Sequence, residues 1–285
     1  MTTLALIGNN DGPLRLLEGL AVRGGHPLAA VLLQKLPDDL RDRYRTLGVE
    51  PLHTPDEASA LAALSDRKFD LLVNCFANFR FRELHHRYPT LNVHPSPLPR
   101  YRGRHPIRWA LINGETEYGI SVHRMSDGWD AGEIVWQRLV DVTPGESARE
   151  LRNRLLDLLA DDFGQFLQDL EQGRHQRIAN DPARATYVTR RRPADGTLTD
   201  WTDRDRIWRT VRALRHDDHP ARLRVAGESY LVRDAERTAR HFVGFVTGTV
   251  VGGGGDRPEI VCADGRTVRL YLDRSAPLRL NDRLD

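Results

Sequence analysis

The chain of 285 residues is poor in cysteine and has no long hydrophobic run. Its two cysteines, Cys75 and Cys262, stand far apart without Cys-x-x-Cys spacing, which favours two buried thiols in a reducing compartment. No segment approaches the ~20 apolar residues that a membrane-spanning helix needs. The amino terminus lacks the basic flank and apolar core of a signal peptide. These absences predict a soluble, cytoplasmic protein without a membrane partner.

An excess of charge of one sign is also absent, since 42 basic residues stand against 40 acidic ones. A surface built mainly to bind nucleic acid is normally rich in basic residues. The balance therefore disfavours nucleic acid as a partner, although it leaves room for a local basic patch. A chain of this length is long enough for two compact domains.

Apolar runs of strand length alternate with helical patterns in the first half of the chain. Strands are predicted at residues 4–8, 27–33, 49–53, 69–75 and 91–94. Helices are predicted at residues 14–23, 57–64 and 146–170. This alternation predicts an α/β fold with a Rossmann-like, doubly wound parallel sheet. In such sheets the functional site lies beyond the carboxyl ends of the strands.

The composition changes after residue 172. Residues 173–185 are polar and contain Gly173 and Pro182, which predicts a linker. One short helix and several short strands follow, at residues 203–214, 223–225, 230–232, 242–251, 260–262 and 268–272. This pattern predicts a small β-rich, barrel-like domain. We therefore expect a catalytic domain at 1–172, a linker at 173–185 and a carboxy-terminal domain at 186–285.

The residues suited to chemistry lie between positions 92 and 132. Asn92 and His94, two positions apart on a predicted strand, point to the same face of the sheet. Three prolines within the next five positions end that strand. Asp130 comes later, before a glycine turn, and predicted strands at 119–125 and 133–137 form a β-ribbon that presents it. Carboxamide, imidazole and carboxylate together can hold a tetrahedral oxyanion and move a proton, as an acyl-type transferase requires.

This stretch resembles the formyltransferases that use 10-formyltetrahydrofolate. Their pattern runs Asn-x-His-x-Ser-x-Leu-Pro, an aromatic residue, a basic residue and Gly, followed by a distant Asp-x-Gly. The chain has each element in order, and departs only at Pro97, where the family usually carries Leu. The run at 102–115 resembles the enzymes that act on nucleotide-linked amino sugars. Segments at 191–196, 200–201, 211–214 and 248–251 resemble the second domain of methionyl-tRNA and sugar formyltransferases, which implies an OB-like barrel.

The resemblance implies a role for each catalytic residue. The Asn92 carboxamide would donate to the formyl oxygen as negative charge develops there, and His94 would assist it. Losing one such donor commonly costs about 2.7–4 kcal/mol of barrier. Asp130 would fix the tautomer of the imidazole and stabilise its protonated form. Whether His94 or Asp130 takes the proton from the amine stays open. The family's chemistry requires no metal, so none is expected.

The resemblance also implies where the two substrates bind. The formyl donor, 10-formyltetrahydrofolate, would lie against the loop after the strand at 69–75. The expected donor contacts are Phe76, Asn78, Phe79, Arg80, Phe81 and Asp127. For Phe76 and Phe79, packing in the core is an equal alternative. The expected contacts with the amine substrate are Ser96, Arg100, Tyr101 and Arg102.

The acceptor is predicted from the segment at 34–43. In methionyl-tRNA formyltransferases the corresponding loop is long and basic, whereas here it is short and its charges balance. This favours a small amine, foremost a nucleotide-linked amino deoxy sugar. Hydroxyornithine-type amines and methionyl-tRNA are alternatives. Glycinamide ribonucleotide formylation and formyltetrahydrofolate hydrolysis rank lower because they lack the second domain. A folate-binding scaffold is the non-enzymatic alternative, and a homodimer is compatible with each.

Overall fold

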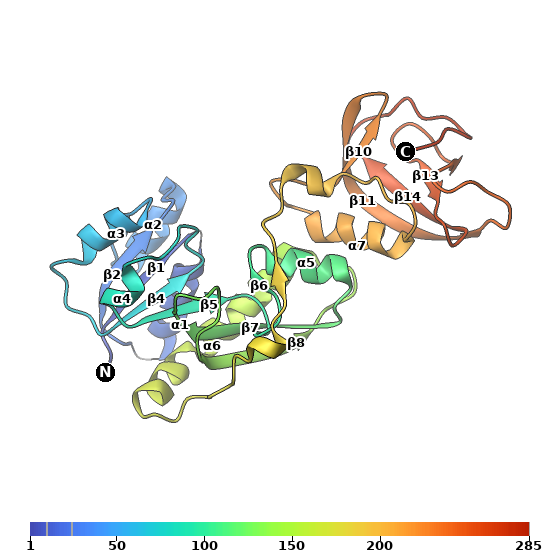
Figure 1. Ribbon diagram of the computed structural model, residues 1–285. Helices are drawn as coiled ribbons and strands as arrows, with labels where there is room; N and C mark the ends of the chain where they lie inside the picture. Colours follow the sequence, from blue (N-terminus) through green and yellow to red (C-terminus); the bar gives the residue numbers. More distant parts are fainter. Residues whose placement is uncertain (10, 24, 285) are drawn as a thin grey trace. The chain divides into compact units, whose positions relative to one another are not determined.

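The computed structural model describes residues 1–9, 11–23 and 25–284, which divide into two compact units (Figure 1). The first unit comprises Met1–Gly103, Tyr118–Val140 and Asn153–Tyr187. The second comprises Arg104–Glu117, Asp141–Arg152 and the chain from Val188 onward. The sequence had assigned residues 104–117 and 141–152 to the first domain, and these borders therefore differ.

A seven-stranded sheet forms the centre of the first unit, and its order is β3-β2-β1-β4-β5-β7-β8. The strands are β1 (Leu4–Gly8), β2 (Leu28–Leu33), β3 (Leu52–His53), β4 (Leu71–Cys75), β5 (Thr90–His94), β7 (Glu117–Arg124) and β8 (Ile134–Asp141). Strands β1 to β5 pair in parallel, and β7 joins β5 antiparallel. The mixed α/β architecture confirms the predicted class, and the neighbouring strands β7 and β8 form the predicted ribbon.

Helices connect and cover these strands. They are α1 (Gly12–Arg23), α2 (Asp38–Thr46), α3 (Glu57–Leu64), α4 (Leu84–Arg87) and α6 (Ala148–Glu171). Helix α3 begins at a capping box, in which Asp56 accepts from the Ser59 amide and Ser59 in turn meets the Asp56 backbone. A Cβ added to Gly8 would lie 2.3 Å from the Cys75 carbonyl oxygen. Close packing against β4 therefore requires a glycine at the end of β1.

The first unit also contains short elements. Strand β6 (Arg102–Gly103) pairs with β9 (Tyr187–Val188), and the 3₁₀ turn η1 spans Pro182–Arg184. Among the described residues, no helix is both long enough and apolar enough to cross a lipid bilayer.

The second unit contains a five-stranded sheet of order β10-β11-β14-β13-β12. Its strands are β10 (Arg222–Val225), β11 (Glu228–His241), β12 (Val250–Gly252), β13 (Glu259–Val261) and β14 (Arg266–Leu272), all paired antiparallel. Helix α7 (Arg204–Leu214), the turn η2 (Pro193–Gly196) and α5 (Pro106–Asn113) complete the unit. In the described part of the chain the sheet is antiparallel and β-rich as predicted, and its closure into an OB-like barrel stays a prediction.

Helix α5 belongs to the second unit because it packs against α7. Ile107, Ala110 and Leu111 are buried, and the helix packs against α7. The Arg209 side chain of α7 donates to the Ile112 carbonyl at 3.0 Å. Such a partnership between segments about a hundred positions apart is invisible in local hydrophobic patterns, which explains the difference in the domain borders.

Candidate active site

Asn92 and His94 lie at the carboxyl end of β5, between β4 and β7, and both side chains are buried. Asp130 reaches them from the turn between β7 and β8. Its Oδ1 lies 3.3 Å from Asn92 Nδ2, which donates to it, and 3.5 Å from His94 Nδ1. Of the three residues that the sequence groups by spacing, Asn92 and His94 therefore both contact Asp130 within the first unit.

Asp130 is held firmly in an unusual conformation. Its φ of 46° lies in the left-handed region, which is uncommon for a residue other than glycine. The Gly103 amide donates to its Oδ2 at 2.8 Å. The Asn180 carboxamide donates to the backbone carbonyls of Asp130 and Gly132 at 2.9 and 2.7 Å, and Asn180 in turn accepts from Arg102 at 2.5 Å. These bonds fix the direction of the carboxylate.

The hydrogen bonds of His94 determine which of its ring nitrogens carries a proton. Nε2 lies 2.9 Å from the Tyr101 carbonyl oxygen, which can only accept, so Nε2 is the protonated nitrogen of the neutral ring. Nδ1 then faces Asp130 with its lone pair. The sequence had assigned the fixing of this tautomer to Asp130, but the Tyr101 carbonyl accomplishes it.

Burial and neighbouring charges set the protonation states of the pair. Burial lowers the pKa of His94, although the Asp130 carboxylate acts in the opposite direction. Burial raises the pKa of Asp130, but His94, His123 and the Gly103 amide together outweigh it and lower that pKa below its usual range. The site at neutral pH is therefore a neutral imidazole beside a carboxylate, which is suited to accept a proton and stabilise the resulting imidazolium.

Two buried residues contact Asn92 that the sequence did not single out. Asn74 on β4 donates from Nδ2 to Asn92 Oδ1 at 2.7 Å. His123 on β7 lies with Nε2 3.0 Å from Asn92 Nδ2. The available signal was a polar residue inside an apolar strand run at each position. This signal alone does not indicate a contact with Asn92, because the contact depends on β4 and β7 flanking β5.

The residues expected to contact the amine substrate mostly have partners within the fold. Ser96 is buried and its hydroxyl donates to the Arg100 carbonyl at 2.9 Å. Tyr101 packs edge-on against Tyr118, with ring centroids 5.7 Å apart. Arg102 is buried and bound to Asn180. These contacts give Ser96, Tyr101 and Arg102 roles in shaping the site, and half-buried Arg100 stays the candidate for a substrate contact.

The loop expected to bind the formyl donor begins at the carboxyl end of β4. The Asn78 amide donates to Gln34 Oε1 at 2.8 Å, while Arg80 is exposed. Phe79 and Phe81 stack with ring centroids 5.1 Å apart and pack, like Phe69, against the core. Phe76 is half-buried, with a positive φ of 71°. Core packing thus accounts for Phe79 and Phe81, and donor binding by the loop stays a prediction.

Asp127, in the turn that carries Asp130, contacts α4. Its Oδ1 lies 3.0 Å from His85 Nε2 and 3.1 Å from His86 Nε2. The hydrogen bond to His85 and the charge of His86 lower the pKa of this exposed carboxyl. The three donor atoms lie within 4.8 Å of one another, which is close enough to share a metal ion. As hydrogen bonds, the same contacts tether the turn that carries Asp127 and Asp130 to α4.

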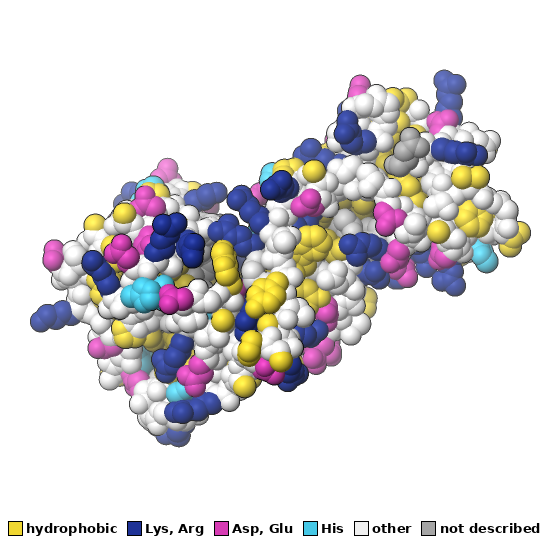
Figure 2. Space-filling model, viewed as in Figure 1, with side chains coloured by type: hydrophobic (Ala, Val, Ile, Leu, Met, Phe, Trp, Pro, Cys, Tyr) yellow, Lys and Arg dark blue, Asp and Glu magenta, His cyan; other side chains and the backbone are white. Residues whose placement is uncertain are grey.

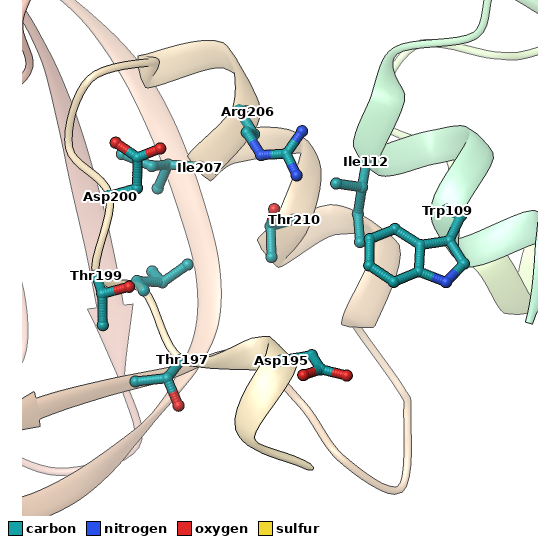
Figure 3. Close-up of a pocket in the computed structure, with 10 residues that line it drawn as sticks. Trp109, Ile112, Asp195, Thr197, Thr199, Asp200, Arg206, Ile207 and Thr210 are labelled. Atoms are coloured by element: carbon teal, nitrogen blue, oxygen red, sulfur yellow. The ribbon is translucent and has the colours of Figure 1, made fainter. Parts of the chain in front are cut away.

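A separate pocket of about 250 Å³ lies in the second unit (Figure 3). Trp109 and Ile112 project from α5 on one side, and Arg206 and Thr210 project from α7 on the other. Residues 195–200 complete its lining. None of the residues predicted to act on either substrate lines this pocket.

The sequence was compared with protein families and curated proteins. Residues 82–162 match the family model described as formyl transferase. A methionyl-tRNA formyltransferase of Geobacter metallireducens (strain ATCC 53774 / DSM 7210 / GS-15) is 41% identical over 115 residues, which are 40% of this chain and 37% of that enzyme. The match therefore spans well under half the length of this curated relative. The 41% identity indicates common ancestry of the matched part.

Two solved structures are similar over nearly the whole chain. An N-formyltransferase from Helicobacter canadensis, in complex with folinic acid and dTDP-3-aminofucose, has a TM-score of 0.75 at 16% identity and covers 95% of this chain and 100% of that one. HypX from Aquifex aeolicus, in complex with tetrahydrofolic acid, has a TM-score of 0.65 at 22% identity and covers 95% of this chain but 43% of that one. At these identities the likeness establishes the fold.

Proposed function

Residues 82–162 match the formyl transferase family, and on that premise we propose that the chain transfers a formyl group from 10-formyltetrahydrofolate to the amine of a small molecule. One observation carries the proposal. Asn92, His94 and Asp130 meet at the carboxyl end of β5, with a carboxamide donor, a neutral imidazole and a carboxylate within 3.5 Å contacts. This is the set of groups that amide formation at a formyl carbon requires.

The first step is attack by the amine. The acceptor nitrogen must be neutral, because an ammonium has no lone pair with which to form the new C–N bond. As that bond forms, the formyl oxygen gains negative charge. Asn92 Nδ2 donates to Asp130 in a long hydrogen bond of 3.3 Å. We propose that the N–H of this bond donates to the formyl oxygen instead when the substrates are bound. A preorganised donor of this kind typically lowers the barrier by about 2.7–4 kcal/mol.

The second step moves a proton from the amine. His94 Nδ1 accepts it, since Nε2 is already committed to the Tyr101 carbonyl. The imidazolium that forms is stabilised by Asp130 at 3.5 Å. Return of the proton to the N10 atom of the folate completes the cleavage of its C–N bond and releases tetrahydrofolate and the formamide. General acid–base assistance of this type is worth about 10²–10⁴-fold in rate.

Solved structures with a similar fold support a folate as the formyl donor. The Helicobacter canadensis structure contains folinic acid and the HypX structure contains tetrahydrofolic acid. In this chain the loop after β4 presents half-buried and exposed positions next to Asn92. Binding of the pteridine there, through backbone groups of residues 76–81, is part of the proposal.

The proposed acceptor is a nucleotide-linked amino deoxy sugar. The Helicobacter canadensis structure, which covers nearly the whole chain, contains dTDP-3-aminofucose. Helix α2 provides a second argument, because two of its three arginines have acidic neighbours. Arg43 lies 3.2 Å from Glu18, and Arg45 lies 2.9 Å from Glu50. Over the face shown in Figure 2, Lys and Arg side chains are interspersed with Asp and Glu, unlike a surface that neutralises several phosphates.

Formylation of methionyl-tRNA is the second candidate. It is favoured by the 41% identity over 115 residues with the Geobacter metallireducens enzyme. That segment covers 40% of this chain. It therefore supports the use of a folate donor more strongly than it supports tRNA as the acceptor.

The test is an acceptor panel. The protein is incubated with 10-formyltetrahydrofolate and, in turn, nucleotide-linked amino sugars, hydroxyornithine and charged initiator tRNA, and release of tetrahydrofolate is followed. We expect release that depends on one class of amine and is greatest with an amino sugar nucleotide. Donor binding without release in the presence of any amine would instead indicate a folate-binding scaffold.

A further inference from the structure

Three buried polar residues form a row across adjacent strands. Asn74 on β4 pairs in register with Asn92 on β5, and Asn92 pairs in register with His123 on β7. Their exposed fractions are 4%, 8% and 2%. Polar groups at such depth are tolerated only when their hydrogen bonds are made. Since each of these side chains contacts the next, the row acts as one hydrogen-bonded unit.

The first end of the row is fixed by a backbone amide. The Ala77 N–H, which can only donate, lies 3.0 Å from one terminal atom of the Asn74 carboxamide, so that atom must be the oxygen. Asn74 Nδ2 therefore faces β5 and donates to Asn92 Oδ1 at 2.7 Å. With its oxygen held in this way, Asn92 directs its Nδ2 protons toward His123 and Asp130.

The other end of the row is fixed by a backbone carbonyl. His123 Nδ1 lies 2.9 Å from the Arg124 carbonyl oxygen, which can only accept, so Nδ1 carries the proton of the neutral ring. His123 Nε2 then accepts from Asn92 Nδ2 at 3.0 Å. Both ends of the row thus require the same orientation of Asn92. A reversed carboxamide would place its oxygen against the Asp130 carboxylate and would face Asn74 with a second donor.

We propose that Asn74 is a positioning residue that orients the Asn92 carboxamide with its donor atoms toward the reacting formyl group. The inference rests on the proposed function for its catalytic consequence. It also links two parts of the site, because the Ala77 amide that orients Asn74 belongs to the loop after β4. A displacement of that loop would therefore change the orientation of the oxyanion donor.

Two variants separate orientation from packing. Asn74→Asp keeps the shape and still accepts from the Ala77 amide, but its carboxylate cannot donate to Asn92 Oδ1. Asn74→Leu removes both bonds. Thr90→Val is the matched control, since Thr90 is buried on β5 and its hydroxyl donates to the Tyr88 carbonyl at 2.8 Å, outside the row. We expect kcat to fall about 10–100-fold in both Asn74 variants, with KM for the formyl donor changed less than about threefold, and no such fall in the control.

A second readout requires no turnover. In ¹⁵N-labelled wild-type protein we expect a scalar coupling across the hydrogen bond from Asn92 Nδ2 to His123 Nε2, and we expect Asn74→Asp to abolish it. A folded Asn74→Asp variant that retains the coupling overturns the proposal, as does a kcat within threefold of the wild type. Absence of formyl transfer by the wild type would refute the proposed function alone, because the coupling still decides the orientation of Asn92.

Discussion

At the scale of single residues, backbone groups define the protonation of the site before any substrate binds. The Tyr101 carbonyl accepts a hydrogen bond from Nε2 of His94, and the Gly103 amide donates a hydrogen bond to Oδ2 of Asp130. Backbone amides and carbonyls have one hydrogen-bonding role each, so they leave no alternative tautomer. The catalytic atoms that remain, His94 Nδ1 and Asp130 Oδ1, lie 3.5 Å apart and face the same space.

The carboxylate of Asp130 is predicted to be essential for turnover. Asn in its place keeps the shape and can still accept from Gly103, but it carries no charge to stabilise the imidazolium of His94. We expect Asp130→Asn to lower kcat by at least about 100-fold, while the midpoint of urea unfolding changes little. Asn92→Ala and His94→Ala should show losses of similar size. Near-normal turnover in any two of these three variants would remove them from the mechanism.

The acid limb of the pH–rate profile is predicted to reflect His94. The mechanism needs its neutral form, so kcat/KM is complete above the pKa of His94 and is lost as the pH falls through it. Because burial lowers that pKa, the part of the limb that does not shift with the pKa of the acceptor amine should have its midpoint below the ordinary value of 6.5. Initial rates from pH 4.5 to 8, with two amines of different pKa, measure it, and unfolding is followed in parallel by circular dichroism. An amine-independent midpoint above 6.5 would show that the charged imidazole is the stable form.

Sequence reasoning predicted the three candidate catalytic residues but missed the residues that support them. Asn92, His94 and Asp130 follow from residue type and spacing along the chain. Asn74 and Asn180 could not be found in that way, because their roles depend on which strand lies beside β5 and which distant loop approaches the turn. The expected substrate contact Ser96 was placed by proximity in sequence; its hydroxyl donates to the Arg100 carbonyl, and its contact with the amine stays a prediction.

At the scale of elements, the turn between β7 and β8 places Asp130, and Gly132 is what allows its path. A Cβ on Gly132 would lie 1.9 Å from the Arg124 carbonyl oxygen, a backbone atom that cannot yield without opening the ribbon. We expect Gly132→Ala to destabilise the protein by about 1–3 kcal/mol in urea unfolding and to lower kcat.

Gly25→Ala is the control for that substitution, since a Cβ there meets no atom within 4 Å. It should leave both the unfolding midpoint and kcat within error of the wild type. If Gly132→Ala behaves like this control, the turn has another conformation than the one that presents Asp130.

Helix α5 in the second unit should make stability depend on pH. His105 precedes this helix with a φ of 61°, and its Nδ1 accepts from the Arg191 amide at 3.2 Å. Burial, together with Arg108 and other neighbouring arginines, lowers the pKa of His105 to about 4. The unfolded chain therefore binds a proton near pH 6.5 that the folded chain refuses until about pH 4.

The sign of the effect follows from this difference. Between pH 6.5 and 4 the unfolded state gains protons, so the contribution of His105 to stability is present at higher pH and declines as the pH falls through this window. We expect urea unfolding to show that decline in the wild type, and a smaller one in His105→Asn. Parallel curves for the two proteins would mean that His105 does not titrate differently on folding.

The order of helices and strands was easier to predict from the sequence than which of them pack against one another. Alternating apolar runs gave the positions of β1, β2, β4 and β5 and the β-rich character of the second unit, because burial on a parallel sheet leaves continuous apolar stretches. Helix α5 groups with the second unit, whereas the sequence places it in the first domain, since its apolar side could have met either unit. What decided it was packing against α7, which lies about a hundred positions further along the chain.

At the scale of the whole molecule, surface charge bears on the acceptor. The 42 basic and 40 acidic residues nearly cancel, and Arg43 and Arg45 of α2 are paired with glutamates. We expect kcat/KM for charged initiator tRNA to be negligible beside that for the best small amine, in assays at the same low ionic strength. Comparable efficiencies that fall steeply with added salt would instead identify a phosphate-binding surface and overturn the choice of acceptor.

The central claim is that the site transfers a formyl group to nitrogen, and isotope labelling tests it most directly. Donor carrying ¹³C in the formyl group is mixed with the protein and the best amine of the panel, and the carbon is followed by NMR. We predict one new ¹³C formamide signal for each tetrahydrofolate released, and none with Asp130→Asn over the same time. Label that appears as formate, or that stays on bound folate, would contradict the account.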